Sequence, residues 1–230
     1  MLGKNLFLVI KNQSKSFSQK TKAQSMVEFA ISLPILIILF SGMVEFGFML
    51  NTYLSLQDAT RAAARYYANS APFEIENEGT PSEVIVDDED FYPNVANFVV
   101  NTLAPTDYVT ARQIPVDPSR DNILVSVISV DVDETATPPV ISTITRHPDG
   151  AEFYYHYNTT SPSSLYTDDV IEDFMTTDSS TPVDAGLLII EIYYSYEGVL
   201  GLPWTLPFFS ESDPTMLYAS TIMPLVAAKP

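Results

Sequence analysis

One apolar run dominates the first part of the chain. Sixteen residues without a formal charge lie between Glu28 and Glu45, and most of them are large and apolar. As a helix this run covers about 24 Å, at about 1.5 Å per residue. A bilayer core of about 30 Å can be spanned if the apolar residues that flank the two glutamates contribute. The pattern therefore predicts a membrane anchor.

The helical pattern continues beyond this anchor. Residues 51–68 contain no Gly or Pro, and apolar or small residues recur there at helical spacing. We expect one helix from about Ser25 to Asn69, ending before Pro72. Pro34 should kink this helix, because proline removes a backbone hydrogen-bond donor within the span.

Residues 1–22 are rich in Ser, Gln and Lys and show no periodic continuation, so they are interpreted as a short disordered leader. The alternative is the n-region of an ordinary secretory signal, with the apolar run as its h-region. The run is longer than a usual h-region, and no small-x-small cleavage site closes it. We therefore favour the anchor.

Downstream of Ala71 the pattern shifts towards strands. The expected elements are a loop over 71–90 with a candidate short strand at 84–86, a helix over 91–103 that Asp90 can cap, a strand over 123–132 with both faces largely covered, a hairpin of 140–146 and 152–157, a short helix over 168–175, and strands over 186–199 and 216–226. The predicted fold class is α+β, with a long N-terminal helix followed by a mostly antiparallel β domain. The corresponding divisions are a basic leader (1–23), the helix (24–69) and an acidic domain (70–230).

Charge is distributed very unevenly around the apolar run. Five lysines and no acidic residue precede it, whereas twenty-six of the twenty-nine acidic residues follow Ala71. Because basic residues favour the cytoplasmic side of a first span, residues 1–25 are expected inside and 51–230 outside. The acidic outer part makes nucleic acid an improbable partner. The chain has no cysteine, so the outer part must be held by its own core or by partner subunits.

The sequence offers no catalytic constellation. There are two histidines, no cysteine, and no phosphate-binding glycine loop or nucleophile motif. Acidic runs at 87–90, 117–121 and 131–134 raise a calcium hypothesis, but none fits a defined loop template. A solvated acidic face is the better interpretation. We expect no enzyme activity, no metal and no cofactor.

Four motifs occur in order in the N-terminal helix. They are Gln-Ser-Met-Val-Glu-Phe-Ala at 24–30, Leu-Pro at 33–34, Gly-Met-Val-Glu-Phe-Gly at 42–47 and Ala-Thr-Arg-Ala-Ala-Ala-Arg-Tyr at 59–66. This order resembles the TadE-like family, the pseudopilins of the tight-adherence (Flp-type) pilus machinery. The close match covers about residues 24–68, and a looser one lies near 187–223.

The resemblance implies that a membrane prepilin peptidase cuts between Ala23 and Gln24. Glu28 and Phe29 would then be the fifth and sixth residues of the mature chain, as is usual in such proteins. The family commonly has Gly where this chain has Ala23. The resemblance also implies that Glu28 pairs with the freed N-terminal amine of a neighbouring subunit during assembly. The alternative is an interfacial glutamate that reaches water.

Three further charged residues have two interpretations each. Glu45 either pairs with a basic residue of a partner helix or marks the outer edge of the membrane. Arg61 and Arg65 either contact partner subunits or lipid phosphates, or lie on an exposed helix surface where Arg61 pairs with Asp58.

Taken together, the resemblance implies a structural, pseudopilin-like subunit in the cytoplasmic membrane of a prokaryote. Its expected partners are other pilin and pseudopilin subunits, the prepilin peptidase, the pilus assembly platform and the lipid bilayer. One alternative is a single-pass surface protein with an extracytoplasmic binding domain. Another is a secreted hydrolase or metal-dependent binding domain with an uncleaved signal.

Overall fold

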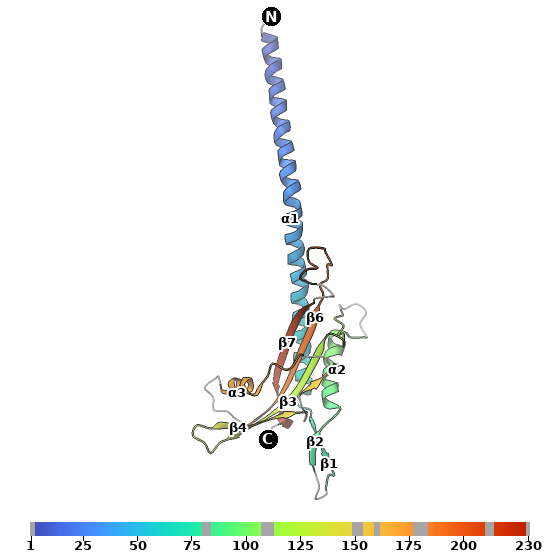
Figure 1. Ribbon diagram of the computed structural model, residues 1–230, viewed down its shortest axis with the longest axis vertical. Helices are drawn as coiled ribbons and strands as arrows, with labels where there is room; N and C mark the ends of the chain where they lie inside the picture. The colour runs from blue at the N-terminus through green and yellow to red at the C-terminus, as the bar shows by residue number, and fades with distance from the viewer. Residues whose placement is uncertain are drawn as a thin grey trace.

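The N-terminal helix is longer than the sequence pattern indicates. The computed structural model describes residues 3–79, 84–106, 113–148, 154–158, 162–176, 184–209 and 214–228, with side chains from Gln24 onward. Helix α1 runs from Gly3 to Tyr67, and its N-terminal part projects beyond the rest of the molecule (Figure 1). The disordered leader was thus a wrong prediction. Between Asn5 and Leu33 the chain contains no Gly or Pro, and adding residues to an existing helix costs far less than nucleating one.

Pro34 does not interrupt α1. Figure 1 shows the helix as one rod without a sharp bend, so the expected kink is slight at most. A proline inside a helix removes one backbone donor, and the remaining hydrogen bonds of a helix this long can keep its course. The exposed and the domain-bound parts of α1 therefore share one axis.

One antiparallel sheet forms the centre of the domain. Its strands are β3 (Asn122–Asp133), β4 (Val140–His147), β5 (Tyr155–His156), β6 (Ala185–Tyr196) and β7 (Thr215–Pro224). Their order is β4-β3-β6-β7, and β5 also pairs with β3. The expected strands over 123–132, 186–199 and 216–226 are confirmed, as is the α+β class.

The hairpin predicted between 140–146 and 152–157 is wrong. Both β4 and β5 pair with β3: Val127 lies opposite His147 of β4, whereas Leu124 lies opposite His156 of β5. Strand β3 has twelve residues and β4 only eight, so the same edge of β3 accommodates two short partners in succession. Residues 149–153 of the expected hairpin, which include part of its turn and the start of its second strand, lie outside the described part of the chain.

The two faces of the sheet bury two separate cores. On one face, α1 and α2 (Phe91–Leu103) pack against alternate residues of β3 and β6, including Ile123, Val125 and Ile190. On the other face, Ile171 of α3 (Asp168–Thr176) packs against the second set of alternate residues, including Ile128. Strands that are covered on both faces have nearly continuous apolar sequences, and this explains the sequences of β3 and β6.

A small hairpin lies where a loop was expected. Strands β1 (Phe73–Glu76) and β2 (Val84–Asp87) pair antiparallel and form a separate two-stranded sheet. The short strand at 84–86 is therefore confirmed, and the remainder of the loop prediction is wrong at residues 73–76. The pattern Phe-Glu-Ile-Glu alternates, but two acidic residues in four give little strand propensity.

Helices α2 and α3 occur where they were expected. The Asp90 side chain, however, makes no capping hydrogen bond at the start of α2. Instead the backbone N–H of Asp90 donates to the Asp88 carboxylate at 2.8 Å. A short 3-10 helix, η1 (Val226–Ala228), follows β7 and closes one end of the first core.

Candidate functional site

Helix α1 has two parts with opposite surroundings. Residues 24–40 are all exposed, and among them Phe29, Leu39 and Phe40 each expose more than half of their surface. From Ser41 onward one side of the helix is buried against the domain, and Leu56, Ala59 and Ala63 are completely buried. By length and composition, Gln24–Tyr67 is compatible with a single membrane crossing. The exposed part is the segment available for lipid or for another subunit.

Of the residues expected at the processing site, Gln24, Glu28 and Phe29 lie on the exposed part of the helix. Glu28 and Phe29 are exposed, and the Gln24 amide donates to Glu28 Oε1 at 3.1 Å. The peptide bond between Ala23 and Gln24 lies within helical backbone. Cleavage there would release an amine one helical turn from Glu28, because residues four apart are neighbours on a helix surface.

Glu45 is held by its own chain. Its carboxylate is completely buried and accepts three hydrogen bonds from the end of β6 and the connection that follows. Oε1 accepts from the Tyr196 hydroxyl at 2.7 Å and from the Val199 N–H at 2.7 Å, and Oε2 accepts from the Leu200 N–H at 2.8 Å. A buried carboxylate is costly unless it is hydrogen-bonded, and this one fixes a distant segment onto α1.

The segment that Glu45 holds has a conformation that requires glycine. Gly198 has a φ of +84°, and a Cβ built there would lie 2.8 Å from Cβ of Phe209 and 3.3 Å from Oε1 of Glu45. A second contact lies one turn towards the N-terminus, where the Trp204 indole N–H donates to Ser41 Oγ at 2.8 Å. The β6–β7 connection is thereby attached to α1 at two successive turns.

The outer half of α1 contacts β7 through a hydroxyl pair. Thr60 Oγ1 and Thr221 Oγ1 lie 2.9 Å apart, and Thr60 is completely buried. Arg61 and Arg65 lie on the opposite, exposed side of the helix. Arg61 donates to Gln57 Oε1 at 2.8 Å rather than pairing with Asp58, so the expected local ion pair is not formed. Both guanidinium groups are accessible to a partner.

A second buried glutamate lies in the domain. Glu191 of β6 is 1% exposed and accepts hydrogen bonds from the Leu165 N–H at 3.0 Å, from the Tyr218 hydroxyl at 2.9 Å and from Ser164. Burial, followed by repulsion from Glu191, raises the pKa of Tyr193 well above its ordinary value. Glu191 thus holds the segment before α3 on the sheet, as Glu45 holds the β6–β7 connection on α1.

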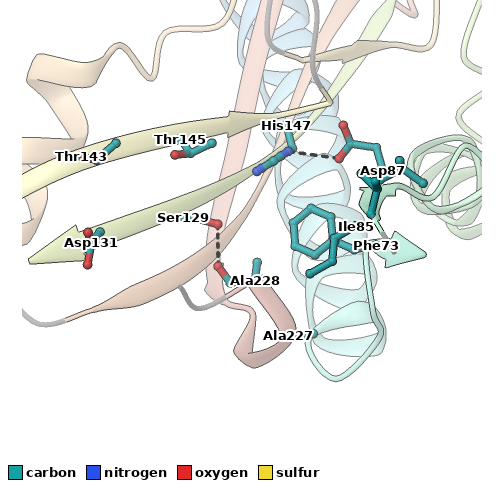
Figure 2. A pocket seen from close by; sticks show the side chains of 12 residues that line it. Phe73, Ile85, Asp87, Ser129, Asp131, Thr143, Thr145, His147, Ala227 and Ala228 are labelled. Atoms are coloured by element: carbon teal, nitrogen blue, oxygen red, sulfur yellow. Dashed lines mark hydrogen bonds and ion pairs between the residues drawn. The ribbon is translucent and has the colours of Figure 1, made fainter. Parts of the chain in front are cut away.

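A cavity of about 850 Å³ lies between the β1–β2 hairpin and the β3–β4 pair. Figure 2 shows Phe73 and Ile85 on one side and Thr143 and Thr145 on the other. His147 Nδ1 lies 3.2 Å from Asp87 Oδ1, at the border between the two sheets. The lining combines apolar and hydroxyl-bearing side chains with Asp87, Asp131 and His147, so the cavity is suited to a small ligand or a peptide side chain that carries a polar group.

The acidic runs stabilise turns. Hydrogen bonds from Ser119 hold the pKa of Asp117 below its usual range, and hydrogen bonds from Thr135 do the same for Asp133. Burial raises the pKa of Asp121, although this carboxylate accepts from the Ser195 N–H at 2.7 Å. Within the described ranges, no group of three or more acidic or histidine side chains is arranged to hold a metal ion.

The fold and the two-part helix define a class: an α+β protein whose membrane-compatible helix also forms part of the core of its domain. Comparison with known families gives the more particular assignment. The model of the TadE-like protein family matches residues 23–65, which confirms the resemblance over the N-terminal helix. No curated protein and no solved structure matches the chain.

Sequence reasoning identified Glu45 but not the residues that bind it. Tyr196, Val199 and Leu200 lie more than 150 residues away, and two of them contribute only backbone N–H groups. Gly198 was the available signal, because a lone glycine after a strong strand indicates a special backbone conformation. Glu191, an acidic residue inside an apolar strand, was a second such signal.

Proposed function

We propose that this protein is a minor pseudopilin of the tight-adherence pilus system, inserted in the cytoplasmic membrane through α1. The domain from residue 70 onward would lie outside and the lysine-rich leader inside, in accordance with the charge asymmetry. The family match at residues 23–65 supports the assignment. The role is assembly rather than catalysis.

The observation that carries this proposal is the division of α1. An apolar stretch at residues 24–40 is exposed along its whole length, and the same helix then continues into the core of the domain. Exposed apolar surface of this extent is covered by lipid or by other helices. A pseudopilin needs both coverings in succession: lipid before assembly, and neighbouring pilin helices afterwards.

Glu28 would set the register of assembly. After cleavage between Ala23 and Gln24 by the prepilin peptidase, the new amine and Glu28 of a neighbouring subunit would pair within the membrane, where a charge is costly unless paired. Glu45 does not need such a partner to be satisfied, because its carboxylate already accepts three hydrogen bonds within the chain. Arg61 and Arg65 remain candidates for contacts with other subunits or the assembly platform.

Mass spectrometry of the membrane-bound protein tests the proposal directly. The expected N-terminus is Gln24, and an intact Met1 in cells that assemble pili would contradict the pseudopilin mechanism. Replacing Glu28 by Ala should abolish incorporation into pili while leaving membrane insertion intact. Ser32→Ala, one turn further along the exposed surface, is the matched control and should assemble normally.

The second candidate is a single-pass surface protein with an external binding domain. The cavity between the β1–β2 hairpin and the β3–β4 pair favours it, because an open cavity of this size accommodates a small ligand. The two proposed functions predict different N-termini for the mature protein. A protein that only anchors a binding domain would retain its leader and would tolerate Glu28→Ala.

A further inference from the structure

The β6–β7 connection exposes a group of large apolar side chains. Val199, Trp204, Leu206 and Phe208 are 49%, 38%, 46% and 70% exposed, respectively. We call residues 199–209 the apolar loop. It contains no charged residue, although the chain as a whole has a net charge of −18. Such a group on a strongly acidic protein indicates a surface that water does not cover in the functional state.

Most backbone N–H groups of the apolar loop donate hydrogen bonds within the protein. The N–H groups of Thr205 and Leu206 donate to the Leu202 carbonyl, and those of Phe208 and Phe209 donate to the Thr205 carbonyl. The Val199 and Leu200 N–H groups donate to Glu45, as described above. Irregular backbone is excluded from hydrocarbon because its polar groups lack partners. In the apolar loop this cost is removed for most of the N–H groups.

The position of the apolar loop along α1 coincides with the expected outer edge of the membrane. A hydrocarbon core of about 30 Å takes about 20 helical residues. Counted from Gln24 or from Glu28, the outer boundary falls between residues 43 and 48. The apolar loop contacts α1 at Ser41 and Glu45, and Figure 1 shows the β6–β7 connection at the end of the domain nearest the projecting part of the helix.

We infer that the apolar loop is seated in the outer interface of the bilayer, beside α1. The inference rests on the proposed insertion of α1. The occupant of this surface is lipid, because the loop lies level with the end of the exposed apolar stretch of α1, where Phe40, Met43 and Phe46 on the other sides of the helix are also exposed. Tryptophan is also enriched at the interface, where its ring lies among acyl chains and its N–H remains hydrogen-bonded.

The position of the apolar loop in the bilayer interface would restrict the motion of the domain. A single helix allows the domain to rotate and tilt, whereas a helix and an attached apolar loop form two points of contact with the membrane. Because Glu45 and Ser41 fix the loop to α1, the domain would leave the membrane only together with its loop. Extraction into a fibre would then transfer the loop from lipid to a neighbouring subunit.

Trp204 is the only tryptophan, which allows a site-specific test. The full-length protein is reconstituted in phosphatidylcholine vesicles that contain phosphatidylcholine brominated either near the headgroup or near the chain end. We expect blue-shifted Trp204 emission that aqueous iodide does not quench. Bromine near the headgroup should reduce its intensity more than bromine near the chain end.

Two relocated tryptophans serve as references in the Trp204→Phe background. Leu36→Trp should be quenched by the deeper bromine, because residue 36 lies inside the span. Tyr66→Trp should be quenched by neither lipid, because it lies about 38 Å beyond Ser41 along the helix. If Leu36→Trp is quenched and Trp204 is not, the seat is disproved and the span stands. If neither tryptophan is quenched, the proposed insertion of α1 is disproved, and so is the position of the apolar loop in the bilayer interface.

A second variant separates lipid from protein as the covering. Phe208→Ser should red-shift Trp204 emission and weaken its quenching by brominated lipid. Phe174→Ser, a residue of comparable exposure (55%) in α3, should change neither. Trp204 that is shielded from iodide yet insensitive to brominated lipid would show that another protein surface covers the apolar loop, and this would overturn the inference.

Discussion

The carboxylate of Glu45 accepts a 2.7 Å hydrogen bond from the hydroxyl of Tyr196, a residue 151 positions further along the chain. Tyr196 is the last residue of β6, and Glu45 lies where α1 changes from exposed to buried. The contact therefore links the end of the central sheet to the start of the domain-bound half of the helix. It makes the orientation of the domain relative to α1 a property of the fold rather than of a flexible linker.

Replacing Glu45 by Ala should destabilise the domain by about 3 kcal/mol, because three donors lose their buried acceptor and two of them are backbone N–H groups. Tyr196→Phe removes one of the three hydrogen bonds and should cost about 1 kcal/mol. The measurement is denaturant unfolding in detergent micelles, followed by circular dichroism. Equal stability of Glu45→Ala and the unmodified protein would show that the contact contributes nothing.

Gly198→Ala should destabilise the β6–β7 connection through two effects, positive φ and a clash of the new Cβ with Phe209. Gly79→Ala is the matched control, because Gly79 has a similar φ of +76° but open space around it. Gly79→Ala should cost about 1 kcal/mol from backbone strain alone. Gly198→Ala should cost more and should also shift Trp204 emission. Equal effects of the two substitutions on stability would show that the clash between the new Cβ and Phe209 contributes nothing.

Alkaline pH should unfold the domain. Burial raises the pKa of Tyr193 and Tyr218 above the ordinary value of 10.0, and the nearby Glu191 carboxylate adds to the effect. The folded state therefore holds these two protons more tightly than the unfolded state does. Their contribution to stability is complete below about pH 10 and is lost as the pH rises above it.

The measurement is tyrosinate absorbance during a pH titration, with circular dichroism recorded in parallel. Tyr193 and Tyr218 should ionise only together with unfolding, and Tyr218→Phe should remove one late-titrating group. Ionisation of every tyrosine before any loss of circular dichroism would contradict this prediction. The titration is most direct in neutral detergent, because residues 24–50 of α1 contain no tyrosine.

The spacing of apolar residues correctly predicted those helices and strands whose structure depends on residues close together in the sequence. The period of α1 placed Leu56, Ala59 and Ala63 on one side, and all three are completely buried. The strands of two-sided burial were recognisable because nothing but apolar sequence suits both faces. The pairing of β5 was not recognisable, since it depends on how much of β3 is left free by β4. The hydrogen-bond partners of Glu45 could not be predicted either, because every residue except proline has a backbone N–H group and the sequence does not show which of them will donate.

The domain should not fold without the outer half of α1. Residues 41–67 of the helix contribute Leu56, Ala59, Ala63 and Ala64 to the core that also contains Ile123 and Ile190. A fragment of residues 70–230 would expose this face of the sheet to water. We therefore expect it to aggregate or to bind hydrophobic dyes, whereas a fragment of residues 41–230 should give a cooperative thermal transition.

Single substitutions within the intact chain distinguish lost packing from a generally damaged fragment. Leu56→Ala, at a completely buried position, should cost about 3 kcal/mol because it removes buried methyl groups and leaves a cavity. Leu54→Ala, at a 52% exposed position two residues away, should cost less than about 0.5 kcal/mol. If 70–230 unfolds cooperatively by itself and Leu56→Ala is as stable as Leu54→Ala, then α1 is only a tether. If both results are as expected, a force on α1 during assembly acts directly on the core of the domain.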